Sequence, residues 1–288
     1  MLHWLLLIIP FYFSYFADEI QFSDRFDDPT AAGVLVTSDL VEASGMIASM
    51  KNQNHFWVIN DSGNNANLFL IDQKGSVVHT YWIKDATNRD WEEITLKKDR
   101  LSGQPLLVIA DIGDNNAVRD DVNLLVFEEP KFSDPSDTLI TEYQKHVYTY
   151  EDGARDAETI IHDPISDDLF IISKREENVR IYLVPSTSGD ETGLLRFKAA
   201  IPLKNVTSAD ITAVGDEIIL KTYTSVFFWE RDKLESIDVA LQSSPERLRY
   251  KPEPQGESIC WDLDGQDFYT LSEKSWSDRQ VLYQHRRK

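Results

Sequence analysis

Cysteine is almost absent from this chain of 288 residues, and the single one, Cys260, can form no internal disulfide. Basic residues are scarce too, since 29 lysines and arginines stand against 49 aspartates and glutamates, for a formal net charge of −20. This charge repels nucleic-acid phosphates and anionic membrane surfaces, so it excludes a nucleic-acid polymer as partner and favours a cation. No serine lies in a Gly-x-Ser-x-Gly elbow, so a nucleophilic triad is not visible.

One long apolar run stands at the N-terminus, where the sequence reads MLHWLLLIIPFYFSYFA before turning acidic at Asp18. Because a membrane-spanning helix needs about 20 apolar residues, we interpret residues 1–17 as a signal peptide and residues 18–288 as a single domain. The run has no lysine or arginine before it and carries Tyr15 where a small residue is usual, so an uncleaved anchor stays an alternative. Secretion would make the protein extracellular, and the sequons at Asn60 and Asn205 then predict a glycoprotein.

A short phrase pairing an acidic residue with a following apolar one recurs about every 50 residues. Its copies read LVEASGM, DWEEITL, RDAETII, TSADITA and QGESICW, and they begin near residues 40, 90, 156, 207 and 255. Each copy continues with short runs rich in β-branched and aromatic residues, separated by Gly, Asp, Asn or Pro, which is typical of strands and turns. Helical periodicity is nearly missing. The repeat therefore predicts an all-β fold, a β-propeller with one four-stranded blade per copy.

The number of copies predicts five blades. The last copy ends after its third strand, and a candidate for the missing outer strand lies at the other end of the chain, in AGVLVTSDL at residues 32–40. We therefore expect a five-bladed β-propeller in which the N-terminal strand completes the C-terminal blade and removes an open sheet edge.

Acidic residues at equivalent positions of the repeat should face one another, because the first strand of each propeller blade lines the central channel. Crowded carboxylates repel by about 1 kcal/mol per pair even in a water-like dielectric, so a ring of them needs a cation. Hard oxygen ligands favour calcium over zinc, which prefers histidine or cysteine. The candidate metal ligands are Glu42, Glu92, Glu158, Asp210 and Glu257. Alternatively, each acid accepts hydrogen bonds from backbone N–H groups of the neighbouring blade.

Polar loops follow the second strand of each repeat, on the rim where a rigid scaffold usually carries function. The candidates for activating water are Asp61, Asp111 and Asp114, in the loops NDSGNNAN and ADIGDNNAVRDD. The candidates for binding an anionic substrate beside a metal are Lys174, Arg175 and Lys274. In the alternative interpretation these runs are solvated turns.

The motifs NDSGN, DWEEIT and ADIGDN resemble the signature of a widespread group of secreted bacterial-type propeller proteins. More distantly, the order of the repeats is similar to that of the calcium-activated nucleotidases, or apyrases. The members of that family are five-bladed propellers that hydrolyse nucleoside di- and triphosphates around a channel calcium, and their ligand ring reads Ser, Glu, Glu, Ser, Glu.

The resemblance to apyrases implies particular ligands in this chain. The three glutamates of the ring would be Glu92, Glu158 and Glu257, and the first ligand would be Ser44 or Glu42. The fourth position falls on Ala209, which has Ser208 and Asp210 beside it. The phrase AETIIH and the following ISKR match the family's HESACW and LPRR, which implies phosphate-binding roles for Lys174 and Arg175. The family's DDRTG is replaced by NDSGN, which lacks the arginine.

Three functions compete at this point. The first is a monomeric binding module in which calcium is structural and the loops recognise a small anionic ligand or an extracellular partner. It ranks first because a propeller fold does not by itself imply catalysis and no full catalytic set is identifiable. The second is a calcium-dependent hydrolase of phosphoanhydrides or phosphoesters. The third is a glycosidase that uses channel carboxylates, with Trp57, Trp91, Trp261 and Trp276 as candidates for stacking sugars.

Overall fold

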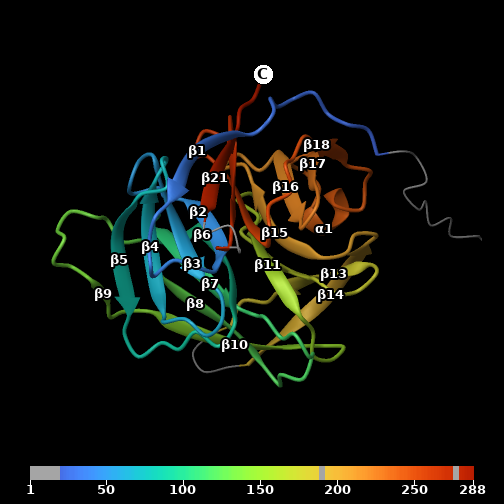
Figure 1. Ribbon diagram of the computed structural model, residues 1–288. Helices are drawn as coiled ribbons and strands as arrows, with labels where there is room; N and C mark the ends of the chain where they lie inside the picture. The colour runs from blue at the N-terminus through green and yellow to red at the C-terminus, as the bar shows by residue number, and fades with distance from the viewer. Residues whose placement is uncertain (1–19, 188–191, 275–278) are drawn as a thin grey trace, which may run out of the picture.

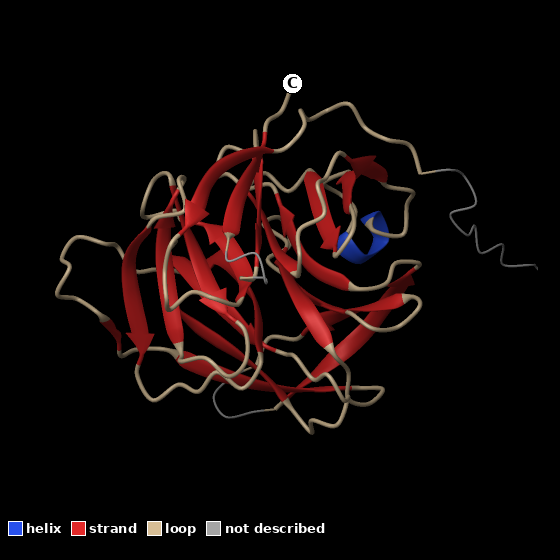
Figure 2. Cartoon of the chain, viewed as in Figure 1, coloured by secondary structure: helices blue, strands red, loops and turns tan. Residues whose placement is uncertain are grey.

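The computed structural model describes residues 20–187, 192–274 and 279–288, and its regular structure is almost entirely β-strand (Figures 1 and 2). Within these residues the one helix is α1, a single turn at Ile237–Ala240. The described part of the chain contains no helix that is long and apolar enough to cross a membrane. The predicted signal peptide, residues 1–17, lies outside the described residues.

The strands of the described residues form four hydrogen-bonded sheets. The first contains β2 (Ala43–Ala48), β3 (His55–Asn60), β4 (Asn67–Asp72) and β5 (Val77–Ile83), with the short β9 (Leu139–Ile140) parallel to β5. The third contains β15 (Val206–Ile211), β16 (Glu217–Thr222), β17 (Val226–Glu230) and β18 (Glu246–Leu248). The fourth contains β19 (Gly256–Trp261), β20 (Phe268–Ser272), β21 (Gln280–His285) and β1 (Thr30–Leu35).

The second sheet has eight strands and consists of two four-stranded units. One unit contains β6 (Trp91–Lys98), β7 (Pro105–Asp111), β8 (Val122–Glu128) and β10 (Gln144–Tyr150). The other contains β11 (Ala157–His162), β12 (Leu169–Ser173), β13 (Val179–Val184) and β14 (Gly193–Ile201). The outer strands β10 and β14 join the units by a short parallel pairing, from Tyr148 opposite Gly193 to Tyr150 opposite Leu195.

The first strand of each four-stranded unit lies at the centre of the molecule. The first five residues of β2, β6, β11, β15 and β19 are all buried. These inner strands contact one another in a closed ring, in the order β2, β6, β11, β15, β19 and back to β2. Sheets that radiate from a closed ring of inner strands form a β-propeller, so the all-β propeller fold predicted from the repeat is confirmed.

The two ends of the chain meet in one sheet. β1 pairs antiparallel with β21, from Thr30 opposite Gln284 to Leu35 opposite Gln280. Figure 1 shows the blue β1 lying beside the red β21. The predicted closure by the N-terminal strand is therefore confirmed, although the strand begins and ends earlier than residues 32–40.

Residues before β1 strengthen this closure by crossing onto the third sheet. The backbone N–H of Ser23 donates to the carbonyl of Arg247 at 2.9 Å, and the N–H of Arg247 donates to Gln21 at 2.8 Å. The buried ring of Phe26 packs edge-on against Phe268, with 5.0 Å between the ring centroids. The N-terminal segment therefore ties the sheet that contains β18 to the sheet that contains β21.

Large aromatic side chains fill the space within and between the sheets. Trp57 and Trp91 have no exposed surface and Trp261 is 2% exposed, so none of the three can stack on a sugar. Trp276, the remaining candidate for sugar stacking, lies outside the described residues. Cys260 is buried and packs in the core cluster of the first sheet, which agrees with a role as a small apolar residue.

Candidate functional site

A β-bulge interrupts every inner strand at the same place. The register against the second strand shifts between Ala43 and Gly45, Trp91 and Glu93, Ala157 and Thr159, Val206 and Ser208, and Gly256 and Ser258. The residues skipped by these shifts are Ser44, Glu92, Glu158, Thr207 and Glu257. A bulge re-aims the side chain of its extra residue, so the bulges place three carboxylates and two hydroxyls at equivalent positions around one end of the channel.

Further carboxylates join this ring from neighbouring positions. Three groups have oxygen atoms that all lie within 4.8 Å of one another: Asp61, Asp90 and Glu92; Asp61, Glu257 and Glu273; and Glu92, Asp156 and Glu158. Because Asp61 and Glu92 each belong to two groups, the seven side chains form one continuous set, which we call the acidic cluster. Asp61 and Glu273 directly follow the second strands β3 and β20, and Asp90 and Asp156 each stand two residues before a ring glutamate.

One buried lysine enters the acidic cluster. The ammonium group of Lys174 donates to Glu158 and lies 3.9 Å from Oε1 of Glu257, and the side chain of Lys174 is 7% exposed. The ammonium group also stands 5.1 Å from the centre of the ring of Tyr223, whose hydroxyl donates to Oε1 of Glu257 at 2.9 Å. Burial opposes the charge of Lys174, but the charges of Glu158 and Glu257 prevail and raise its pKa. Lys174 therefore stays an ammonium ion and balances one of the seven carboxylates.

Burial and the remaining negative charge raise the pKa values of several carboxyl groups in the acidic cluster. Burial, with the charge of Glu257 added to it, raises the pKa of Glu273 to about 9. Burial also raises the pKa of Glu158 to about 8, although the charge of Lys174 opposes the change. For Asp61, burial and the charge of Glu257 outweigh a backbone hydrogen bond from Ser62 and raise the pKa to about 6. The cluster therefore needs either protons or a cation to be stable at neutral pH.

Among the described residues, the buried Oε2 of Glu257 accepts no hydrogen bond from an N–H or hydroxyl group, and Glu257 as a whole is 5% exposed. The side chain of Glu257 can share a hydrogen bond with the carboxyl group of Glu273 when Glu273 is protonated. Gly113 leaves room for the carboxylates on the other side of the cluster, because a Cβ atom at this position would lie 2.6 Å from Cγ of Asp90 and overlap Glu92. This close approach explains the glycine in the loop ADIGDN.

Of the residues predicted to activate water, Asp61 alone belongs to the acidic cluster. Asp111 forms a 2.8 Å ion pair with Arg119, and Asp114 accepts the backbone N–H of Arg119 at 2.7 Å. Both carboxylates are buried. Asp111 and Asp114 therefore hold the loop after β7 in place, a role that the sequence did not reveal.

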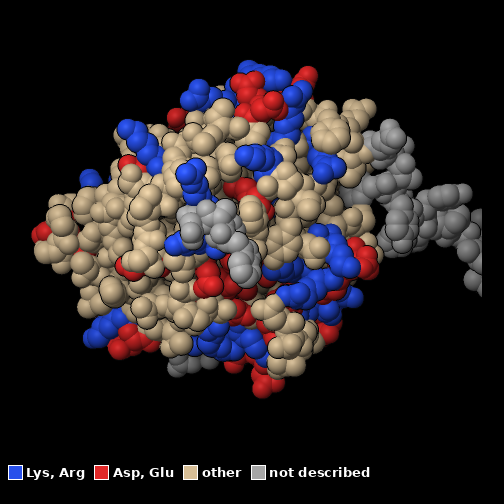
Figure 3. Space-filling view, viewed as in Figure 1, with Lys and Arg blue, Asp and Glu red and all other residues tan. Residues whose placement is uncertain are grey.

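The residues predicted to bind an anion lie at different depths. Lys174 is buried in the acidic cluster, whereas the side chain of Arg175 is 50% exposed and pairs with Asp156 at the rim. Lys274 is exposed, and its backbone N–H donates to the carbonyl of Val41 at 2.7 Å. On the face drawn in Figure 3, Asp and Glu side chains gather near the centre with Lys and Arg side chains around them.

Only some of the predicted metal ligands lie in the acidic cluster. Glu92, Glu158 and Glu257 belong to the acidic cluster. Glu42 lies at its edge, where the side chain accepts a hydrogen bond from Asn64. The hydroxyl of Ser44 donates to the carbonyl of Trp91 at 2.9 Å.

Asp210 does not join the other predicted ligands. Its two oxygens accept the backbone N–H groups of Ile211 and Trp261, both at 2.8 Å. Trp261 belongs to β19, the neighbouring inner strand, so Asp210 clasps two inner strands together as the alternative interpretation described. The bulge assigns the ring position of β15 to Thr207, three residues earlier.

Five further residues belong to this site and were not predicted from the sequence: Asp90, Asp156, Glu273, Tyr223 and Thr207. Two signals could have found most of them. The pattern Asp-x-Glu occurs in two successive repeats, as Asp90 with Glu92 and as Asp156 with Glu158. In addition, Asp61, Lys174, Tyr223 and Glu273 each follow the last residue of a second strand, so an alignment of the strand ends would have brought them together.

The two predicted glycosylation sites differ in access. Asn60 is 2% exposed, and its side-chain oxygen accepts the N–H groups of Val41 and Glu42, both at 3.1 Å. Asn205 is exposed at the start of β15. A glycan therefore fits at Asn205 and has no room at Asn60.

No family model matches the chain, and no curated protein matches it. Among solved structures, the chain is similar to the β-propeller domain of Cps50 (Swd1) from Myceliophteria thermophila, with 10% identity, 89% of this chain and 99% of that chain covered, and a TM-score of 0.45. The WD40 domain of Neurospora crassa Pan2 has 9% identity, with 92% and 97% covered and a TM-score of 0.45. The Dos1 propeller has 9% identity, with 84% and 67% covered and a TM-score of 0.39.

The class of protein therefore rests on the topology itself. The chain is an all-β propeller closed by its N-terminal strand, and one mouth of its channel carries the acidic cluster. The predicted resemblance to apyrases finds no support in a matching family model.

Proposed function

We propose that this protein is a propeller-based binding module whose acidic cluster takes up a divalent cation, and that the cation is calcium. The observation that carries the proposal is that Oε2 of Glu257 is buried and accepts no hydrogen bond from an N–H or hydroxyl group of the described residues. This oxygen lies in the acidic cluster, where the buried Lys174 stands among seven carboxyl groups. Calcium takes six to eight oxygen ligands in flexible geometry, which suits carboxylates that come from several loops and strands.

Asp61, Glu257 and Glu273 are the residues best suited to hold the ion. Their oxygens lie within 4.8 Å of one another, and the buried Oε2 described above belongs to Glu257. The group of Glu92, Asp156 and Glu158 is less suitable because Lys174 already donates a hydrogen bond to Glu158. When bound, calcium would neutralise the carboxylates and attract an anionic group to the channel mouth.

The rim around the acidic cluster favours a small anionic ligand or an extracellular partner with an acidic group. Half of the side chain of Arg175 is exposed, and Lys274 is exposed on the loop after β20. Exposed cations beside a bound metal hold anions through complementary charge, and the ligand can be exchanged because these side chains remain solvated.

The proposal includes two further points about the molecule. We count the eight-stranded sheet as two blades, which makes five in all, because each four-stranded unit has its own inner strand and the units share only the short pairing of β10 with β14. We also infer that the protein is secreted, since residues 1–17 have the character of a signal peptide and Asn205 is exposed within a sequon. N-terminal sequencing of protein from a secreting host tests cleavage, and a mobility shift with an endoglycosidase tests the glycan.

Thermal unfolding with and without calcium tests the metal proposal. We expect a saturating concentration, about 100 times the Kd, to raise Tm by roughly 5 °C relative to protein in chelator. Glu257→Gln should lose most of this shift, whereas Glu142→Gln, which changes an exposed loop residue, should keep it. If neither calcium nor magnesium moves the wild-type transition, the proposal is wrong.

One observation favours the hydrolase as a second candidate. Asp61 is half-buried in the acidic cluster with a pKa of about 6, mainly because of burial, and a carboxylate with a pKa near the working pH can act as a general base. We would measure phosphate release from a panel of nucleoside di- and triphosphates in calcium and in chelator. Calcium-dependent release that is lost in Asp61→Asn would favour the hydrolase, and no release at millimolar calcium would remove it.

A further inference from the structure

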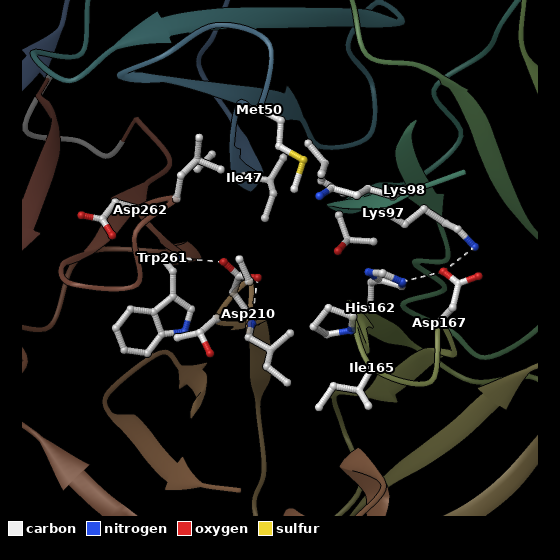
Figure 4. Close-up of a pocket in the computed structure, with 18 of the residues that line it drawn as sticks. Ile47, Met50, Lys97, Lys98, His162, Ile165, Asp167, Asp210, Trp261 and Asp262 are labelled. Carbon is white, nitrogen blue, oxygen red and sulfur yellow. Dashed lines mark hydrogen bonds and ion pairs between the residues drawn. The ribbon is translucent and has the colours of Figure 1, made fainter. Parts of the chain in front are cut away.

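The channel mouth opposite the acidic cluster contains a cavity of about 660 Å³ (Figure 4). Every inner strand contributes to the lining, through residues at its end or in the loop that follows, and no residue of the acidic cluster takes part. Glu93 and Ser208 lie between the two mouths, where they hydrogen-bond across the channel. A volume of about 300–1,000 Å³ is typical of sites for small molecules, so the cavity can enclose one.

Apolar side chains form just over half of the cavity wall. Its apolar side chains include Ile47 and Met50 from the β2 side, Leu96 from β6, Ile165 from the loop after β11, Ile211 from β15 and Leu263 from the loop after β19. Of these side chains, Ile47, Met50 and Ile165 are seen around the open centre in Figure 4. Small-molecule sites combine such walls with a few polar groups that orient the ligand, so the polar groups decide the class of ligand.

The acidic side chains of the lining are already engaged. The carboxylate of Asp167 accepts a hydrogen bond from Nε2 of His162 at 2.8 Å. It also forms ion pairs with Lys97 at 3.2 Å and with Arg100 at 2.6 Å. Asp210 accepts two backbone N–H groups, as described above. The side chain of Lys97 points away from the centre of the cavity, toward Asp167 (Figure 4).

The two remaining acids of the lining cap their own turns. Asp99 accepts the backbone N–H of Ser102 at 2.7 Å, and Asp262 accepts that of Gln266 at 2.9 Å. Each acid of the lining therefore already accepts a hydrogen bond or pairs with a cation, and the surplus charge near Asp167 is positive.

Lys98 is the cation left to face a ligand. Its side chain points toward the cavity, near Met50, whereas that of Lys97 points away (Figure 4). Lys98 is exposed, and it forms no ion pair within the part of the chain that the structure describes. In a protein with a net charge of −20, an unpaired ammonium group above an apolar wall is complementary to a single anion.

We propose that this cavity binds a small ligand with an apolar body and one anionic head. The body lies against the apolar wall, and the head is held by Lys98. The site is independent of the metal site proposed above, because the two lie at opposite mouths of the channel.

Two fluorescent probes that differ by one charged group test the proposal. Anilinonaphthalene sulfonate has an apolar body and one sulfonate, and N-phenyl-1-naphthylamine has the same body without the charge. We expect saturable one-to-one binding of the sulfonate. Lys98→Gln should weaken binding of the sulfonate by about fivefold to tenfold and change binding of the neutral probe by less than about twofold. Lys84→Gln, which alters an exposed lysine outside the cavity, should affect neither probe.

A pair of tryptophan variants tests the location. Ala213 is exposed and lines the cavity, so Ala213→Trp should block the mouth and abolish binding. Val214 is the exposed next residue and does not line the cavity, so Val214→Trp should leave binding unchanged. The proposal is overturned if the sulfonate does not saturate, if Lys98→Gln weakens both probes equally, or if the two tryptophan variants behave alike.

Discussion

The carboxyl group of Glu93 in β6 accepts a hydrogen bond from the hydroxyl of Ser208 in β15, across the axis of the propeller. β6 and β15 are not neighbours in the ring of inner strands, so this pair ties opposite sides of the channel together. Glu93 and Ser208 are both buried, and the layer they form separates the acidic cluster from the apolar cavity. The channel therefore has two mouths with different chemistry.

The first prediction concerns Glu93 itself. Burial raises its pKa well above the usual range, although hydrogen bonds from Ser208 and the backbone of Ile94 oppose the change. Burial disfavours the charged form of Glu93, so Glu93→Gln, which keeps the shape of the side chain without the charge, should be tolerated. Glu93→Ala should lower the free energy of unfolding by about 3 kcal/mol, because it leaves a cavity and an unpaired hydroxyl at Ser208. Urea unfolding measures both variants, and equal losses would contradict the prediction.

The second prediction concerns pH. The pKa values of Asp61, Glu158 and Glu273 are raised to about 6, 8 and 9, chiefly by burial, so the folded state binds protons more tightly than the unfolded state. The resulting stability is fully present below the unfolded pKa values near 4 and is lost progressively as pH rises from about 4 through the folded values, up to about 9. In chelator, Tm should therefore fall over this range.

Calcium should reduce that fall, because the ion replaces protons as the neutralising charge. Glu273→Gln removes one titrating group and should make the fall in chelator smaller. Thermal scans at pH 6, 7.5 and 9 provide the measurement. A Tm in chelator that rises with pH would mean that the folded cluster does not hold protons.

The third prediction concerns Lys174. Lys174→Met removes the ammonium group from Glu158 and should lower the free energy of unfolding in chelator by about 3–5 kcal/mol, since the buried carboxyl groups of the cluster lose the cation that lies among them. The variant should also show a larger calcium-dependent rise in Tm than the wild type, because the cluster gains one uncompensated negative charge. Lys84→Met, at an exposed position, serves as the control. A smaller calcium effect in Lys174→Met than in the wild type would contradict the prediction.

The fourth prediction concerns the N-terminal segment. Phe26→Ala should cost about 3–5 kcal/mol of unfolding free energy, because the Phe26 ring is 1% exposed and packs among Phe228, Trp261 and Phe268. Phe22→Ala is the matched control, since Phe22 is 70% exposed and should cost less than about 0.5 kcal/mol. Guanidinium unfolding compares the two variants. A cost for Phe26→Ala as small as that for Phe22→Ala would show that the segment before β1 does not strengthen the closure.

Much of the candidate site could be predicted from the repeat. Glu92, Glu158 and Glu257 occupy equivalent positions of successive copies, and equivalence in a propeller becomes proximity around the channel. Asp210 misled the alignment because it directly precedes an isoleucine, whereas each ring glutamate stands two residues before one. The bulge in β15 lies between Val206 and Ser208, so Thr207 and not Asp210 occupies the ring position. The position of a bulge depends on hydrogen bonds between strands, which the sequence pattern does not reveal.

By itself, the sequence determined the all-β propeller, the strand that closes it and the ring glutamates, because strand periodicity and repeat spacing are local properties of the chain. Only the tertiary structure decided that Asp111 and Asp114 are held by Arg119, that Asp90, Asp156 and Glu273 complete the acidic cluster, and that Glu93 meets Ser208. These contacts join segments whose distance and orientation depend on how the sheets are arranged around the axis, and no short stretch of sequence contains that information.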